Sequence, residues 1–138
     1  REYQEVVLER GIRKLLHQAR IGERFTRVEV GNDEYHATFP FVEKQDDHTI
    51  KAIKPLHLDQ AQPSKILDHG GQWLFRVQAL KKRGLLPPRV LFAIRGPRTQ
   101  EDPRSAAARE IAESLSSTGV DVLAYGDNQR ILEFAAAR

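Results

Sequence analysis

Residues 39–56, which read FPFVEKQDDHTIKAIKPL, contain the pattern that decides the fold. Apolar, aromatic and β-branched side chains fill both ends of this stretch, and the polar residues Gln45-Asp46-Asp47 separate them. Aromatic and β-branched residues favour strands, and Asp is a common turn residue. The stretch therefore predicts a β-hairpin, with one strand from Tyr35 to Val42 and the next from Thr49 to Leu58.

The sequence before this hairpin predicts a helix and one further strand. Apolar residues recur at helical spacing from Glu5 to Arg20, and Gly22 follows where a C-terminal cap is expected. Apolar and charged residues alternate from Arg24 to Val30, which is typical of a strand, and a polar turn cluster at residues 31–34 precedes the hairpin. We therefore expect an antiparallel meander of three strands after an amphipathic helix.

The second half of the chain alternates between helical and strand patterns. A helical stripe continues from Pro63 to Gly84, and Gly70-Gly71 within it predicts either two short helices or one helix with a flexible joint. The run RVLFAI at residues 89–94 is typical of a strand covered on both faces. A helix that starts at Asp102-Pro103, a strand from Val120 to Tyr125 and a short last helix complete the pattern.

This order of elements predicts one α/β domain over residues 1–138, built around a mixed sheet. The order is helix, three-strand antiparallel meander, helix, strand, helix, strand, helix. The last two strands are expected to be parallel, with a right-handed crossover. Because the chain begins at Arg1 and contains no Met, we expect it to be a domain excised from a longer chain.

The composition excludes several classes of protein. The chain has 138 residues, of which 40% are hydrophobic and 30% charged, as in ordinary globular domains. It has no Cys, which excludes disulfides and thiolate metal sites, and its five His show no HxH or HxxxH spacing, so no metal site is predicted. No apolar run approaches the roughly 20 residues that cross a bilayer, and no signal-peptide pattern is present. We therefore expect a cytoplasmic protein with no membrane partner.

Basic residues are concentrated in one part of the chain. Lys and Arg number 22 against 19 acids, which gives a net charge of +3. Most of this excess lies between Lys65 and Arg104, and phosphate groups are the ligands that such a cluster would bind. The residues expected to contact nucleic acid are Lys54, Lys81, Lys82, Arg83 and Arg95. Trp73 and Phe75 lie beside this cluster and could stack on bases, although Trp73 also falls on the apolar stripe, where core packing is expected.

The order of elements resembles the restriction-endonuclease-like PD-(D/E)xK nuclease fold. In that family a Pro-Asp on the second strand and a Glu-x-Lys on the third place two acids beside a lysine, and the acids hold Mg²⁺. Here Pro40-Phe41 replaces Pro-Asp, and Ala52-Ile53-Lys54 replaces Glu-x-Lys. The proline and the lysine match, but both metal-binding acids are missing. The resemblance therefore implies a catalytically degenerate pseudonuclease with no metal or other cofactor.

The run at residues 39–56 is also similar to a bacterial and phage domain family of uncharacterised function (DUF1829-like). That family shows a Phe-x-Phe strand followed by an Ile-x-x-Ile strand that ends in Asn/Lys-Pro. The similarity brings no assigned activity, but it implies a bacterial or phage setting.

Three functions stay open. The first is a non-catalytic domain that binds DNA, RNA or a protein partner. The second is an active Mg²⁺-dependent nuclease with relocated acids, whose catalytic residues would be Glu43, Asp46 and Lys54. The third is a protein-interaction or oligomerisation module that does not bind nucleic acid. The other acids considered for relocation are Glu9, Glu29, Asp47 and Asp59.

The surroundings of Lys54 decide between these functions: two or three carboxylates within reach of its ammonium would favour catalysis, and a purely apolar surround would exclude it. Side chains alternate along a strand, so Lys54 shares a face with Ala52 and Leu56. Either it extends along the sheet edge to reach water, which is the preferred interpretation, or it faces a polar pocket. Asp68-His69 is interpreted as part of the joint at Gly70-Gly71 rather than as a catalytic pair, because helical neighbours point about 100° apart.

Overall fold

The computed structural model describes residues 3–99 and 101–138, which form four α-helices, one short 3₁₀ helix and five strands. In chain order these are α1 (Tyr3–Gln18), η1 (Gly22–Arg24), β1 (Thr26–Gly31), β2 (His36–Gln45), β3 (His48–His57), α2 (Pro63–Lys82), β4 (Arg89–Arg95), α3 (Pro103–Ser117), β5 (Asp121–Ala124) and α4 (Asn128–Ala136). Within the described residues, no helix combines the length and the apolar character needed to cross a membrane.

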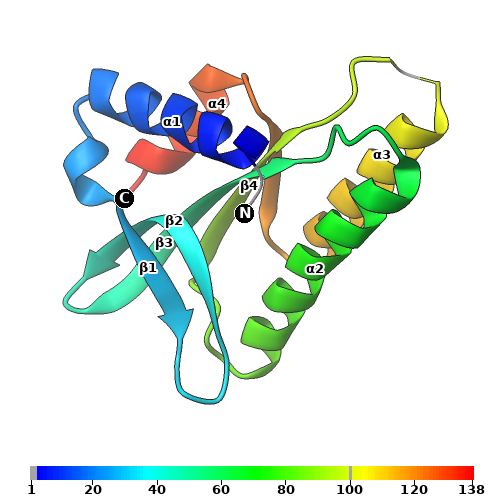
Figure 1. Ribbon diagram of the computed structural model, residues 1–138. Helices are drawn as coiled ribbons and strands as arrows, with labels where there is room; N and C mark the ends of the chain where they lie inside the picture. Colours follow the sequence, from blue (N-terminus) through cyan, green and yellow to red (C-terminus); the bar gives the residue numbers. More distant parts are fainter. Residues whose placement is uncertain (1–2, 100) are drawn as a thin grey trace.

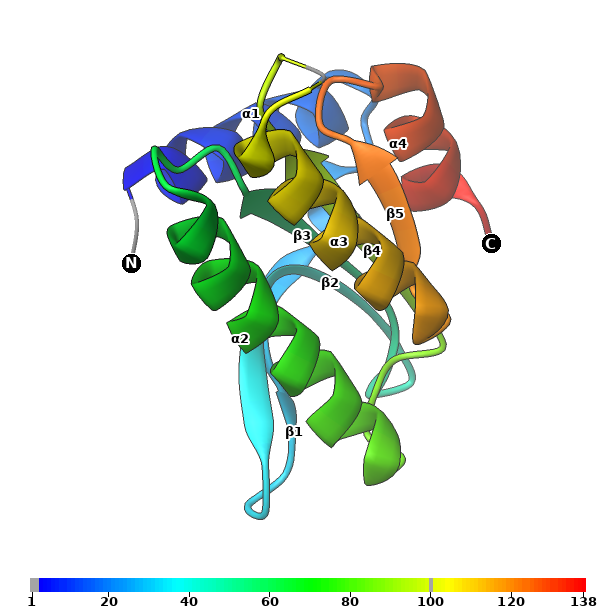
Figure 2. The ribbon, with the colours of Figure 1, turned by 90° about the vertical axis from the view of Figure 1, so that its right-hand side faces the viewer.

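The five strands form one mixed sheet in the order β1-β2-β3-β4-β5. β1, β2 and β3 pair antiparallel, whereas β4 pairs parallel to β3 and β5 pairs parallel to β4. Helices α1 and α4 cover one face of the sheet, and α2 and α3 cover the other (Figure 1 and Figure 2). The predicted α/β class, with a meander followed by parallel strands, is confirmed, and β3 is the middle strand.

Local chemistry explains where the elements begin and end. Asp102 caps α3, because its carboxylate accepts a 2.9 Å hydrogen bond from the Ser105 amide and Pro103 occupies the first helical position. The β2–β3 turn is a two-residue turn in which Asp46 and Asp47 both have positive φ, 52° and 64°. That geometry matches the twist of the flanking strands, and Asp tolerates it better than most residues.

The core consists of two apolar layers, one on each face of the sheet. Between the sheet and α2, Trp73 packs edge-to-face against Phe39 and Phe92, with centroid distances of 5.4 and 6.0 Å. Between the sheet and α1, Phe41 and Ile53 pack with residues of α1 and α4. Burial on both faces explains the continuous apolar run in β4.

A bulge in β2 sends neighbouring aromatic residues into different layers. Thr26 pairs with Val42 and Val28 pairs with Phe39, so β2 has one more residue than β1 between these two pairs. Alternation along the strand is therefore interrupted, and Phe41 faces the α1 layer although Phe39, two residues earlier, faces the α2 layer.

The predicted joint at Gly70-Gly71 is wrong, because α2 continues unbroken from Pro63 to Lys82. Gly70 is required for close packing of α2 against α3. A Cβ atom at Gly70 would lie 2.5 Å from Cγ1 of Ile111, whereas one at Gly71 would meet nothing within 4 Å. The first glycine therefore serves helix packing rather than flexibility.

Candidate functional site

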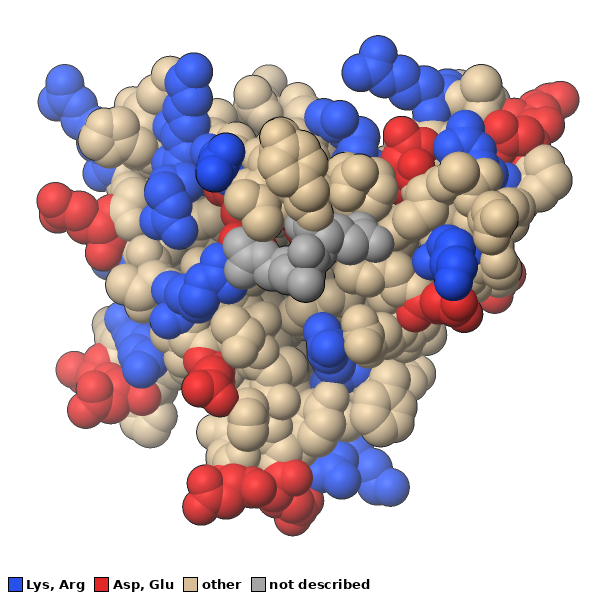
Figure 3. Space-filling view, viewed as in Figure 1, with Lys and Arg blue, Asp and Glu red and all other residues tan. Residues whose placement is uncertain are grey.

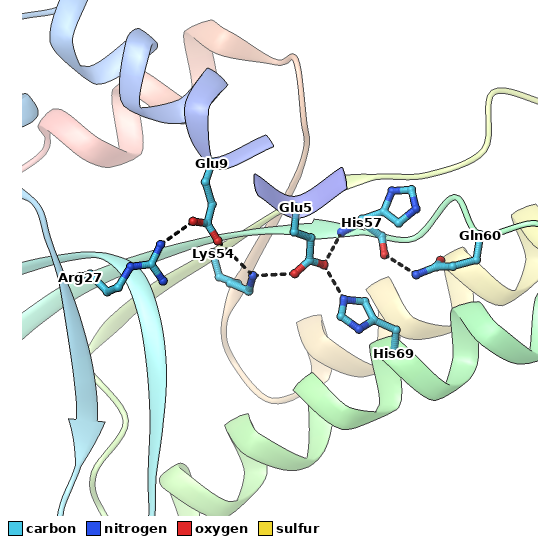
Figure 4. A network of polar contacts seen from close by, with 7 residues as sticks. All are labelled: Glu5, Glu9, Arg27, Lys54, His57, Gln60 and His69. Carbon is cyan, nitrogen blue, oxygen red and sulfur yellow. Dashed lines mark hydrogen bonds and ion pairs between the residues drawn. The ribbon is translucent and has the colours of Figure 1, made fainter. Parts of the chain in front are cut away.

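A cleft of about 690 Å³ opens between α1, the β1–β2 hairpin, the end of β3 and α2. Figure 4 shows part of its polar lining, namely Glu5, Glu9, Arg27, Lys54 and His69. The lining residues are Glu5, Glu9, Arg27, His36, Ala37, Thr38, Pro40, Lys54, His69, Gln72, Trp73 and Arg76.

Lys54 lies at the floor of this cleft. It belongs to the middle strand of the sheet and its side chain is only 4% exposed. The ammonium lies 2.9 Å from Oε1 of Glu5, 4.0 Å from Oε2 of Glu9 and 4.9 Å from the centroid of the Trp73 ring. The expectation that Lys54 reaches water along a sheet edge is therefore wrong, and the alternative of a polar pocket is correct.

Glu5 is the most heavily engaged carboxylate of the cleft. Its Oε1 accepts the hydrogen bond from Lys54, and its Oε2 accepts hydrogen bonds from the His57 amide, at 2.9 Å, and from Nε2 of His69 (Figure 4). Burial by itself raises the pKa of a carboxyl group. Here the His69 hydrogen bond, the Lys54 charge and the hydrogen bonds from His57 and Lys54 outweigh it, and they lower the pKa of Glu5 to about 2. Glu5 is therefore an anion at every physiological pH.

Glu9 lies one helical turn after Glu5 and connects the cleft to β1. Its Oε1 accepts a 2.5 Å hydrogen bond from Nη2 of Arg27, and its Oε2 faces Lys54. Glu9 is one of the acids considered for relocation, and it lies beside Lys54. Two carboxylates, Glu5 and Glu9, are therefore within reach of the ammonium, which is the arrangement expected of the active-nuclease alternative. The two carboxylates of α1 are thus held by a lysine from β3, a histidine from α2 and an arginine from β1.

The sequence contained a signal for this cluster. Glu5 and Glu9 fall on the same helical stripe as Leu8, Ile12 and Leu16, so helical spacing alone places two acids on the buried face of α1. An acid on an apolar stripe needs a partner in the core. The sequence contains no comparable signal for the contact between His69 and Glu5, because this contact depends on how α2 packs beside α1.

Glu43 and Asp46, the two acids predicted to be catalytic in a relocated nuclease site, do not reach Lys54. Glu43 faces the opposite side of the sheet, where its carboxylate lies 3.8 Å from Nζ of Lys51. Burial lowers the pKa of Lys51, although the charge of Glu43 opposes this, and its ammonium donates hydrogen bonds to the carbonyls of Ala135 and Ala137 at the end of α4.

The remaining candidate acids have other surroundings. Asp46 and Asp47 lie in the exposed turn before β3, roughly 20 Å along the strand from Lys54. Glu29 pairs with His36 at 3.0 Å, and Asp59 pairs with Arg104 at 3.0 Å.

The two strands that carry the nuclease-like pattern do lie side by side. Phe41 pairs with Ile53, and the next residues, Pro40 and Lys54, both line the cleft. Phe41 packs into the α1 layer, however, and Ala52 packs into the α2 layer. The positions that would carry the metal-binding acids are therefore core positions.

The predicted nucleic-acid residues do not form one surface. Lys54 is at the cleft floor, and Arg95 lies at the end of β4 with its guanidinium 4.9 Å from the centroid of the Tyr125 ring. Lys81, Lys82 and Arg83 lie at the far end of α2, roughly 18 Å along the helix axis from His69. Lys81 donates a hydrogen bond to the Thr118 carbonyl there.

The donors of the cleft do not fit Mg²⁺, which the nuclease resemblance would imply. Both oxygens of Glu5 already accept hydrogen bonds, and the charges of Lys54 and Arg27 balance the two carboxylates. A divalent cation would have to displace an ammonium from this cluster. In the described part of the chain, no group of three or more His, Asp or Glu side chains is arranged to hold a metal ion.

Comparisons with known proteins do not indicate a function for this chain. Searches with the chain against protein-family models, curated proteins and solved structures find no match. Any function assigned to the cleft therefore has to follow from its charges, its shape and the residues around it.

Proposed function

We propose that this domain is a pseudonuclease of restriction-endonuclease-like fold, whose cleft binds the phosphate groups of nucleic acid without cleaving them. The order of elements, the adjacency of β2 and β3 and the place of Lys54 support the fold assignment. The charge pattern of the cleft supports binding without cleavage.

The cleft contains more permanent cations than carboxylates. Three permanent cations, Lys54, Arg27 and Arg76, line it together with two carboxylates, Glu5 and Glu9. Both carboxylates are occupied by cations of the protein itself, so neither repels an incoming phosphate strongly. The cleft therefore keeps a positive excess without any bound metal ion.

The main support for the proposal is the position of Arg76 in the cleft. Its guanidinium lies 4.6 Å from the centroid of the Trp73 ring and lines the cleft. Among residues 3–99 and 101–138, no carboxylate lies within ion-pair distance of it. Stacking on Trp73 leaves the donor edge of the guanidinium available, and a guanidinium binds phosphate with two parallel hydrogen bonds.

The surface around the cleft agrees with this assignment. Lys and Arg side chains lie on both sides of the middle of the face shown in Figure 3, whereas many of the acidic side chains in that view lie toward its outer edges.

Salt-dependent binding of labelled oligonucleotides tests the proposal. We expect the logarithm of the binding constant to fall linearly with the logarithm of the salt concentration. The Arg76→Ala variant should bind more weakly, with a slope smaller by about one. Arg130→Ala is the matched control, because Arg130 is exposed on α4 on the other side of the sheet and loses the same charge. Equal binding by the two variants would refute the role of the cleft.

Trp73 gives a second readout, because it is the single Trp of the chain and lines the cleft. We expect its fluorescence to change on addition of an oligonucleotide, and to change less in Arg76→Ala. Incubation of plasmid DNA and of RNA with Mg²⁺ or Mn²⁺ completes the test. Cleavage that is lost in Glu5→Gln or Glu9→Gln would replace our proposal with an active nuclease.

A further inference from the structure

An exposed aromatic patch adjoins the cleft. We define the patch by Tyr35, Phe75 and Arg83. Phe75 is 62% exposed on the outer side of α2, and its ring meets the ring of Tyr35 edge-to-face, with a centroid distance of 6.2 Å. The Arg83 guanidinium lies 5.6 Å from the centroid of the Tyr35 ring.

The position of Phe75 is not explained by the core. Trp73, two residues earlier on α2, is buried against Phe39 and Phe92, whereas Phe75 keeps most of its surface in water. Two residues along a helix correspond to a rotation of about 200°, so the two side chains leave α2 in nearly opposite directions. The exposed face of this ring is available for contact with a ligand.

Two residues of the patch are the chain neighbours of residues that line the cleft. Tyr35 precedes His36, and Phe75 precedes Arg76, and both of these neighbours line the cleft. A ligand whose phosphate is held at Arg76 can therefore extend its neighbouring groups over the two rings without leaving the protein.

The charges of the patch favour a polyanion. Arg83 forms an exposed ion pair with Glu34, with 2.7 Å between Nε and Oε1. Exposed pairs of this kind are weak, so a phosphate can replace Glu34 as the partner of Arg83. Rings interleaved with guanidinium groups are the arrangement by which proteins bind single strands, because every base presents a flat face for stacking.

We propose that the aromatic patch stacks the unpaired bases of a single-stranded nucleic acid whose backbone is held at Arg76. This inference rests on the proposed function of the cleft, and it adds the class of nucleic acid. A duplex keeps its bases stacked inside, so it can use the cleft cations but not the rings. Single strands therefore bind more tightly than duplexes of the same length.

Binding of a single-stranded and a duplex oligonucleotide of equal length, at one salt concentration, tests the inference. Phe75→Ala should weaken binding of the single strand about tenfold, since loss of one stacked base has an effect of this size, and should leave duplex binding unchanged. Phe75→Tyr keeps the ring and should bind as the unmodified chain does. Gln78→Ala, at another exposed position of α2, is the matched control.

The outcomes separate this inference from the proposed function. If both oligonucleotides depend on Arg76 and neither depends on Phe75, the cleft binds phosphate and the patch is not a stacking surface. If neither oligonucleotide binds, both proposals fail. If Phe75→Ala changes only self-association, measured by sedimentation, the patch is a protein interface and the inference is wrong.

Discussion

The ammonium of Lys54 and the carboxylate of Glu5 form a buried ion pair, 2.9 Å apart, that connects the middle strand of the sheet to the first helix. Both side chains are almost fully buried, and the pair is extended by His69 and by the His57 amide. The cluster therefore holds the polar side chains of the cleft in place and, at the same time, stabilises the packing of α1 on the sheet.

Removal of the lysine should destabilise the fold strongly. Lys54→Met leaves the Glu5 carboxylate buried without its cation, and breaking a buried pair in this way costs about 3–5 kcal/mol in the free energy of unfolding. The double variant Lys54→Met/Glu5→Leu should recover part of the loss, because an apolar pair replaces the charged one. Denaturant unfolding measures both effects.

The exposed pair Arg83–Glu34 provides a control for that experiment. Its side chains are 34% and 67% exposed, so Glu34→Gln should change the free energy of unfolding by at most about 1 kcal/mol. A loss of similar size in Lys54→Met would show that the Lys54–Glu5 pair contributes no more than a surface pair.

Stability should fall in acid because of Glu5. Its pKa is about 2 in the folded chain, below the ordinary value of 4.5, so the unfolded chain binds the proton more readily. The stabilisation is complete above about pH 4.5 and is lost as the pH falls toward 2; its size is on the order of 3 kcal/mol. In Glu5→Gln, a plot of unfolding free energy against pH should be flatter in this window. An unchanged slope would contradict the low pKa of Glu5.

Substitution by alanine should lower the stability of the fold at one of the two adjacent glycines of α2 and raise it at the other. Gly70→Ala places a methyl group against the buried side chain of Ile111, and overpacking of this kind costs about 1–3 kcal/mol. Gly71→Ala meets nothing within 4 Å and should stabilise the helix by about 0.5–1 kcal/mol. Thermal unfolding of the two variants measures the difference. Equal stabilisation of both would place α2 farther from α3 than the structure does.

Replacement of Phe41 by Asp restores the acid of the nuclease motif on β2, but it should not create a nuclease. Phe41 is 1% exposed in the α1 layer, where the Arg13 guanidinium lies 5.1 Å from the centroid of its ring. Phe41→Asp therefore buries a carboxylate in this largely apolar layer instead of placing it in the cleft. We expect a loss of more than about 3 kcal/mol of stability and no Mg²⁺-dependent cleavage of DNA. Phe41→Leu, which keeps the site apolar, should cost far less. A folded Phe41→Asp variant that cleaves DNA would show that this position faces the cleft.

Local sequence patterns specify the elements and their order. The aromatic and β-branched residues of the stretch 39–56, the helical spacing in residues 5–20 and the cap at Asp102 are local properties, and such properties decide whether a segment forms a helix or a strand. Helical spacing is also consistent with Glu5 and Glu9 on the buried side of α1, although Glu5 is not among the site residues predicted from the sequence. Alternation along a strand places Lys54 on the face of β3 that carries Ala52 and Leu56.

The partners of these charges depend on how the elements pack together. The β2 bulge turns Phe41 away from Phe39, and Gly70 is explained by the close approach of α2 to α3 rather than by a flexible joint. His69 joined Glu5 because α1 and α2 both pass the end of β3, although 64 residues separate the pair in the chain. The physical reason is that a buried charge selects its partner by proximity in the packed core, and sequence spacing specifies that proximity only within a single helix or strand.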